Sequence, residues 1–410
     1  MEKIFKKLEN NVRIIYNWSS ASYNCVERKE VNMKDKILSF ILSLIIVAII
    51  VVGGIFGYTA FVEITGEDPI QINFEGYGGL LSKDDKDTED TISVDKDIFN
   101  GIESNENSAQ SIVTNPNRYR HLYGQLNSTA QKIYDKLYEN KENLKTGTYK
   151  IEFGNTFQKL LTSDGGEKEL KKQYQSAIEA LIYENPELFY IEATGMFINI
   201  EKITKISGVK YDVYINNGSE SNYLTKGFNG KDDVDSYQVQ IEKVRDYILS
   251  NLNGRTDYEK IKLVHDYLVD SIEYDSSISK DHIYDIYGAL VSRECVCEGY
   301  AKAFQYLMNE VGIDNVIVIG TGTNSNGQTE SHAWNYVKLD NKWYAVDVTW
   351  DDPILIGTGK LPEKSKYKYF LKGSITMNEN HTPSGKFTDA GQVFTYPVLS
   401  EQDYEWKGEK

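Results

Sequence analysis

The sequence predicts an α+β protein that follows a single N-terminal transmembrane helix. Three observations lead to this fold class. One apolar stretch near the N-terminus is long enough to cross a bilayer. Helical periodicity and strand-like alternation then occupy separate parts of the remaining chain, as expected for helices packed on antiparallel sheets. The chain has 410 residues, 40% of them hydrophobic, which is enough for one large domain or two ordinary ones.

The apolar stretch is residues 37–62, which are 26 residues without a charged side chain. About 20 residues span a bilayer, whereas the apolar part of a signal peptide has about 7–15. No A-x-A cleavage pattern follows, so we expect an uncleaved anchor. Lys34 and Lys36 lie just before the stretch, and the next basic residue is Lys83. The positive-inside rule therefore predicts a cytoplasmic N-terminal segment, residues 1–36, in the cell membrane with extracellular C-terminal domains.

Beyond the predicted span, composition divides the chain into three parts. Residues 63–117 are rich in Asp, Glu, Ser and Asn, too polar to bury a core, and we expect an acidic disordered stalk. Residues 118–250 are expected to form an α+β extracellular domain, and residues 251–410 the domain that carries chemistry. The net charge of −16 and the lack of a basic stripe argue against a nucleic-acid partner.

The apolar pattern predicts the elements of the first extracellular part and the start of the second. Helices are expected at 125–140, 168–183, 235–252 and 258–272. Strands are expected at 189–191, 196–203 and 209–215, the last two as a hairpin.

Cys297 lies at the N-terminal end of a further predicted helix. Apolar residues recur at helical spacing from Tyr300 to Val311, and Gly312 supplies a C-terminal stop. The N-terminus of a helix carries about half an elementary positive charge, which favours a reactive thiolate. The alternative is a cysteine that only packs in the core, and position alone does not separate the two interpretations. Cys295 is too close in sequence for an unstrained disulfide with Cys297.

After a buried strand at 315–319, two alternating segments are expected to form a hairpin. They cover 331–339 and 342–348 and are separated by Asp340-Asn341, a pair suited to a two-residue turn. A two-residue turn makes Leu339 face Lys342, and this fixes the register of the whole hairpin.

In that register His332 and Asp347 share one face of the sheet. Asp347 would lie opposite Trp334, so that His332 is its diagonal neighbour, within reach of a long side chain. A carboxylate in this place holds an imidazole in one tautomer and stabilises its charged form. A three-residue turn would instead put the two side chains on opposite faces. His265 lies on a predicted helix, where packing or hydrogen bonding is expected.

No cofactor and no metal site are expected from the sequence. It contains neither an H-E-x-x-H motif nor a pair of C-x-x-C motifs, which are the usual patterns of zinc ligands.

Several short motifs together carry a family resemblance. They are H-D-Y-L at 265–268, Y-G-A-L-V at 287–291, V-C-E-G-Y-A-K-A-F at 296–304, H-A-W-N-Y-V at 332–337 and W-Y-A-V-D-V-T-W-D-D-P at 343–353. In this order, residues 257–353 resemble the transglutaminase-like superfamily, whose papain-like core packs a cysteine-bearing helix on an antiparallel sheet that carries the histidine and the aspartate. N-P-E-L-F-Y at 185–190 is similar to the region before the core in membrane-anchored bacterial members. The resemblance is loose over 118–250.

The resemblance implies a catalytic triad. It assigns the nucleophile to Cys297, the general base to His332 and the orienting carboxylate to Asp347, and it leaves Cys295 as a bystander. It implies a membrane-anchored cysteine acyl-transfer enzyme that acts on peptide or carboxamide bonds of proteins or cell-wall peptides. Water would resolve the acyl-thioester in a protease or amidase, and an amine would resolve it in a transamidase. The alternative is a non-catalytic surface module for binding or scaffolding with the same fold.

Overall fold

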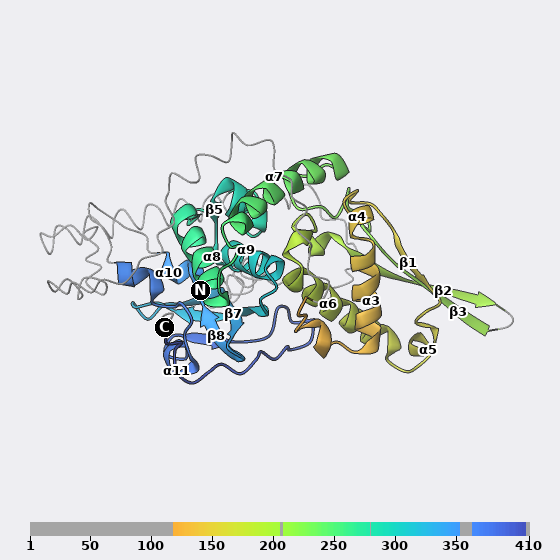
Figure 1. Ribbon diagram of the computed structural model, residues 1–410. Helices are drawn as coiled ribbons and strands as arrows, with labels where there is room; N and C mark the ends of the chain where they lie inside the picture. Colours follow the sequence, from red (N-terminus) through yellow and green to blue (C-terminus); the bar gives the residue numbers. More distant parts are fainter. Residues whose placement is uncertain (1–117, 206–207, 279, 353–362, 407–410) are drawn as a thin grey trace, which may run out of the picture. The chain divides into compact units, whose positions relative to one another are not determined.

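The computed structural model describes residues 118–205, 208–278, 280–352 and 363–406 (Figure 1). The predicted cytoplasmic segment, membrane span and stalk lie outside these residues. Among the helices that are described, none combines the length and the apolar character that a membrane crossing requires. All described residues belong to one compact unit.

The first half of the described chain places helices beside a three-stranded antiparallel sheet. The helices are α3 (Ser128–Glu139), α4 (Lys141–Leu144), α5 (Gln158–Leu161), α6 (Gly166–Glu184) and α7 (Lys231–Ser250), with short 3-10 turns η3 (Tyr123–Gln125), η4 (Pro186–Leu188) and η5 (Ala193–Gly195). The strands are β1 (Ile151–Gly154), β2 (Phe197–Lys205) and β3 (Gly208–Asn216), in the order β1-β3-β2. The pairing of β2 with β3 confirms the predicted hairpin, which extends away from the helices (Figure 1).

Side-chain caps explain where the helices begin. Asn127 accepts hydrogen bonds from the backbone N–H groups of Thr129 and Ala130, so α3 starts three residues later than predicted. Thr256 and Glu259 form a capping box at the start of α8 (Asp257–Ser271). The four long helices of the sequence prediction are confirmed, with ends shifted by a few residues.

The predicted strand at 189–191 is wrong. A 3-10 turn begins at Pro186, and only Ile191 makes a single bridge, to Leu224. Phe189 and Tyr190 are buried in the core from a turn. The apolar run therefore indicated burial and not extended backbone.

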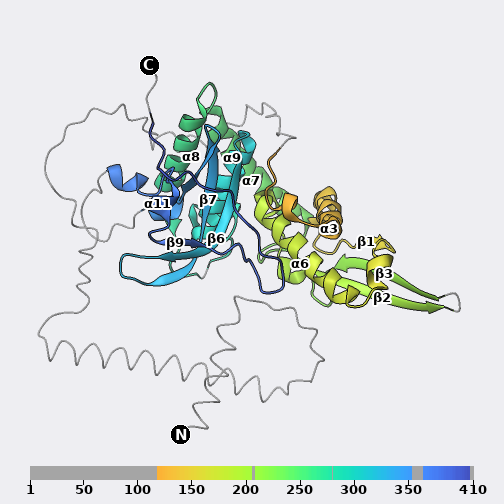
Figure 2. The ribbon, with the colours of Figure 1, turned by 90° about the horizontal axis from the view of Figure 1, so that it is seen from below.

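The second half carries a four-stranded antiparallel sheet with helices. Its helices are α8, α9 (Cys297–Glu310), α10 (Val348–Asp351) and α11 (Ser374–Met377), with a π turn η6 (Gly288–Ser292) and a 3-10 turn η7 (Glu363–Tyr367). Its strands are β4 (Glu273–Tyr274), β5 (Glu294–Cys295), β6 (Asn315–Thr323), β7 (Thr329–Leu339), β8 (Lys342–Val346) and β9 (His381–Pro383). The larger sheet has the order β8-β7-β6-β9, and Figure 2 labels β7, β6 and β9. The short strands β4 and β5 pair in parallel.

The turn between β7 and β8 has the two-residue form that the hairpin prediction required. Asp340 and Asn341 both adopt positive φ, 50° and 62°, a conformation that Asn and Asp tolerate better than other side chains. Leu339 pairs with Lys342, and the register is as predicted. The second strand ends two residues early, at Val346, because Asp347 instead caps α10 by accepting a hydrogen bond from the Trp350 N–H.

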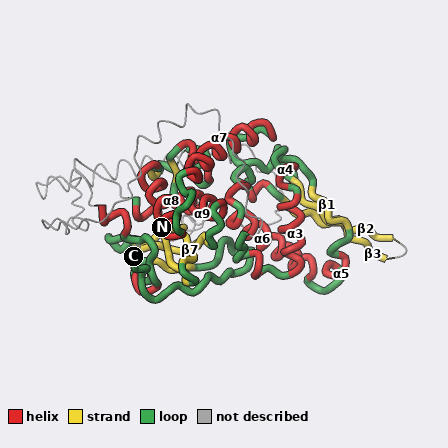
Figure 3. The backbone as a smooth tube through the Cα atoms, in the orientation of Figure 1, coloured by secondary structure: helices red, strands yellow, loops and turns green. Residues whose placement is uncertain are grey.

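A C-terminal strap, residues 384–397, returns from β9 to the first half of the chain. The Gln392 N–H donates to Ser176 Oγ on α6 at 2.9 Å, and the Thr395 N–H donates to Gln125 Oε1 at 2.8 Å. One buried hydrophobic cluster accordingly runs from Leu122 to Phe394. The two sheets lie at opposite ends of the described chain with helices between them (Figure 3).

Candidate active site

Cys297 is the first residue of α9. The preceding Val296 is extended and offers no side-chain cap, so within the described residues the first-turn N–H groups receive no capping side chain. Gly299 lets the first turn of α9 lie close to Cys295 and Ile283, because a Cβ at this position would be 2.8 Å from Cys295 Sγ and 2.9 Å from the Ile283 carbonyl oxygen. A thiol, backbone N–H donors without a side-chain cap and the positive end of a helix dipole thus coincide.

The two neighbouring cysteines differ in access to solvent. Cys297 is partly exposed, whereas Cys295 is fully buried, and both thiols are free. Burial raises the pKa of the Cys295 thiol well above its usual value. Cys295 therefore stays a neutral thiol at physiological pH, beyond the reach of a substrate.

His332, on β7, connects the cysteine to a carboxylate. Its Nε2 lies 2.7 Å from Asp347 Oδ2, and both side chains are buried. Burial alone would lower the pKa of His332, but the Asp347 carboxylate and the nearby Cys297 raise it to about 10. The structure thus brings together the three residues that the sequence analysis singled out, in the order thiol, imidazole, carboxylate.

Asp347 has two histidine partners, and the sequence analysis did not predict the second one. His381 Nε2, on β9, lies 2.9 Å from the same Oδ2 atom that bonds His332. Burial alone would raise the pKa of Asp347, but His332 and His381 hold it well below its usual value. Asp347 therefore stays ionised although it is fully buried.

The first half of the chain also reaches Cys297. Tyr183, on α6, packs with Cys297 against Ala301, and burial and the nearby Glu298 raise the pKa of its hydroxyl well above the usual value. Glu298 forms an ion pair of 2.7 Å with Lys302. Nothing in the sequence pattern placed Tyr183 here, because its helix lies more than 100 residues before Cys297.

His265 belongs to a separate buried cluster. Its Nδ1 lies 3.0 Å from Asp266 and its Nε2 3.1 Å from Asp351, and Asp351 also accepts a hydrogen bond from the Tyr369 N–H. Burial alone would lower the pKa of His265, but the two carboxylates raise it to about 9. This confirms the expected role in packing and hydrogen bonding and anchors α8 to α10.

One group of ligand-type atoms in the described residues has a spacing that suits a metal ion. The atoms come from His332, Asp347 and His381 and lie within 4.8 Å of one another. They already hydrogen-bond to each other, and all three side chains are buried. A cation here would occupy the nitrogen through which His332 binds Asp347, so we assign the group to hydrogen bonding.

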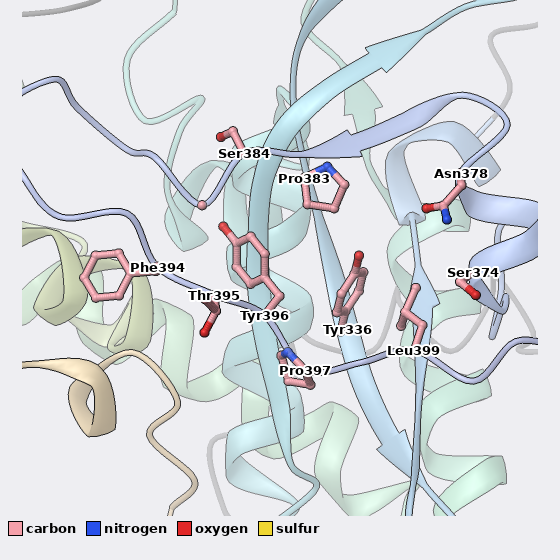
Figure 4. Close-up of a pocket in the computed structure, with 11 residues that line it drawn as sticks. Tyr336, Ser374, Asn378, Pro383, Ser384, Phe394, Thr395, Tyr396, Pro397 and Leu399 are labelled. Carbon is pink, nitrogen blue, oxygen red and sulfur yellow. The ribbon is translucent and has the colours of Figure 1, made fainter.

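A pocket of about 360 Å³ lies elsewhere in the second half (Figure 4). Its walls come from β7, from the ends of α11 and β9, and from the strap, with Tyr336 and Tyr396 among them. Cys297, His332 and Asp347 do not line it.

Comparison with known proteins agrees with the geometry. Residues 247–348 match the model of the transglutaminase-like superfamily. Kyphoscoliosis peptidase is 26% identical in Mus musculus and 27% identical in Homo sapiens, over 168 residues. The aligned part is 38% of this chain and 25% of each relative, so the chain spans about a quarter of the length of the curated relatives that it matches.

Two solved structures are similar to part of the chain. The crystal structure of a TGase is 18% identical with a TM-score of 0.26, covering 43% of this chain and 50% of that one. The periplasmic domain of TgpA from Pseudomonas aeruginosa is 12% identical with a TM-score of 0.22, covering 38% and 63%. Residues 247–348, with the helix of Cys297 and the strands that carry His332 and lead to Asp347, form a domain of the transglutaminase-like superfamily.

Proposed function

We propose that this protein is a membrane-anchored extracellular cysteine enzyme that transfers acyl groups from peptide or carboxamide bonds of proteins or cell-wall peptides. One observation carries the proposal. The partly exposed Cys297 thiol is near enough to His332 to help raise the pKa of its imidazole, and His332 Nε2 lies 2.7 Å from the buried carboxylate of Asp347. This geometry matches a nucleophile, a base and an orienting group.

The proposed reaction follows from the positions of these groups. The Cys297 thiolate attacks the carbonyl carbon, and the backbone N–H groups of Cys297 and Glu298 at the start of α9 stabilise the resulting oxyanion. Each such donor contributes about 10²–10³-fold in rate. The C–N bond then breaks, and the His332 imidazolium gives its proton to the leaving amine. Water or a primary amine attacks the acyl-thioester, returning its proton to His332 and releasing the Cys297 thiolate.

Alkylation kinetics test whether Cys297 is activated. In the full-length protein carrying Cys25→Ser and Cys295→Ala, Cys297 is the sole thiol. We expect iodoacetamide to modify it nearly as fast at pH 6 as at pH 8, because imidazolium and the helix dipole favour the thiolate. An ordinary thiol would react about tenfold more slowly for each pH unit below its ordinary pKa near 8.5. Such a dependence in this protein, or equal rates after His332→Ala, would support the non-catalytic binding module.

The location is proposed from residues 37–62 and the basic residues before them. Protease added to intact cells should remove the part of the chain after residue 62 and leave an anchored N-terminal fragment. An epitope at the N-terminus should resist cleavage until the membrane is opened. A C-terminal epitope that survives on intact cells would show that the topology is wrong.

A further inference from the structure

His381 shares the Asp347 carboxylate with His332. One carboxylate oxygen, Oδ2, faces His332 Nε2 at 2.7 Å and His381 Nε2 at 2.9 Å. The other oxygen, Oδ1, accepts from the Trp350 N–H at 3.2 Å. Asp347 is fully buried, so these protein donors are what replace water around its charge.

The surroundings of His381 fix the position of its ring. Its Nδ1 lies 2.7 Å from Asn380 Oδ1, and Asn380 Nδ2 donates to the Tyr369 hydroxyl at 2.7 Å, which sets the orientation of the amide. Both ring nitrogens of His381 therefore have an oxygen partner within hydrogen-bond distance. The ring packs against Trp350, with centroids 4.5 Å apart, and against Trp334 at 5.0 Å.

We propose that His381 is a positioning residue, whose Nε2–H keeps Asp347 oriented while His332 gives up and regains its proton. The proposal rests on the proposed acyl-transfer function. When His332 loses its proton to the leaving amine, Asp347 loses a cationic partner in a buried site. A second donor on Oδ2 keeps the carboxylate ionised and in place through that step, so His332 returns to the same tautomer and the same contact with Cys297.

The charged and titratable groups around His381 come from several elements. His332 is on β7, Asp347 and Asp351 are at the two ends of α10, and Tyr369 follows η7. Burial, and then the Asp347, Asp351 and Glu379 charges, raise the pKa of Tyr369 to about 12, so its hydroxyl stays neutral. Asp347 is the anion in contact with His381, because Asp351 is already bonded to His265 and the Tyr369 N–H.

Two substitutions at this position separate hydrogen bonding from packing. His381→Phe keeps an aromatic ring between Trp350 and Trp334 but removes the donor. His381→Gln removes the ring and keeps an N–H near the place of Nε2. Both are made in the full-length protein with Cys297 as the sole thiol, and alkylation of Cys297 is followed from pH 5 to 9.

We expect His381→Phe to slow alkylation at neutral pH by about 10–100-fold, the effect of losing one hydrogen bond to a charge. The lower pH limit of Cys297 alkylation in this variant should also move upward, because a buried carboxylate with fewer hydrogen-bond donors binds a proton at higher pH. His381→Gln should stay within about threefold of the parent, on the same scale. Asn380→Ala leaves the imidazole in place but frees its orientation, and should give a smaller loss in the same direction. Thermal unfolding of each variant confirms that it is folded.

Three outcomes would overturn the inference, and a fourth would overturn the proposed function. Normal alkylation in the Phe variant with a loss in the Gln variant would show that the ring only packs. Parent-like behaviour of all three variants would show that His381 has no role in positioning. Loss of alkylation with EDTA and recovery with Zn²⁺ would show that the cluster binds a metal. An ordinary thiol in the unmodified parent would instead overturn the proposed function, before any change at His381 is considered.

Discussion

Cys297→Ala is expected to lower kcat on a responsive peptide or carboxamide substrate by about 10⁵–10⁶-fold, the loss seen when a covalent nucleophile is removed. The reason is that no other thiol in the described residues is both near His332 and open to solvent. The measurement is turnover of a peptide library by the full-length protein, with products identified by mass. Addition of a primary amine then separates hydrolysis from transamidation, because an amine acceptor appears in the product.

Cys295→Ala is the matched control for this substitution. The side chain is fully buried two residues away, so its loss is expected to lower the free energy of unfolding by about 1 kcal/mol. Turnover per folded molecule should be kept. The opposite result, an active Cys297→Ala protein and an inactive Cys295→Ala protein, would exclude Cys297 as the nucleophile.

Asp347→Asn is expected to lower kcat by about 10⁴-fold, the size of the effect when a triad carboxylate is made neutral. An amide can donate to the imidazole and stabilise the wrong tautomer. The alkaline limit of the pH–rate profile should move to lower pH, because the Asp347 charge helps to raise the pKa of His332 to about 10. The profile should be recorded from pH 5 to 11.

The same substitution has a predictable effect on stability. His332 has a raised pKa in the folded state, so its ion pair stabilises the protein fully below about pH 6.5, the unfolded value. That contribution is lost as the pH rises through about 10. The difference in unfolding free energy between wild type and Asp347→Asn should therefore be larger at pH 6 than at pH 10.5, as measured with urea.

Asp266→Asn provides a control in a similar setting. Asp266 is also a buried carboxylate bonded to a buried histidine, but its partner His265 lies in the cluster that anchors α8. It should lose stability and keep kcat within about tenfold, on the scale of a hydrogen-bond loss. Equal losses of kcat in the two variants would mean that Asp347 acts only through stability.

The sequence predicted the part of the site that follows from local geometry. The start of the helix at Cys297 could be predicted because the apolar periodicity of the helix and the turn before it are local properties of the sequence. The register of β7 and β8 follows from Asp340 and Asn341, two residues able to adopt positive φ. The alternation of side chains along the two strands then determines which side of the sheet each residue occupies. These inferences needed only residues within one hairpin or one helix.

The missing partners depend on contacts between distant segments. His381 lies in a strand of three residues, too short for a period-two pattern, and β9 joins the sheet beside β6 and not beside its neighbour in sequence. Tyr183 looks like any apolar position of an amphipathic helix. Alternation also continues through Asp347 in the sequence, although the chain turns there, because capping of α10 depends on a side chain and not on periodicity.

The return of the strap to α6 has a consequence for the order of events during synthesis. A ribosome delivers Cys297, His332 and Asp347 well before His381 and the residues that bind Gln125 and Ser176. Elements made first fold first, but the last contacts around the carboxylate form only after the C-terminal stretch has emerged. The nascent chain therefore carries its thiol in an unfinished setting, which is completed only after His381 and the strap have emerged.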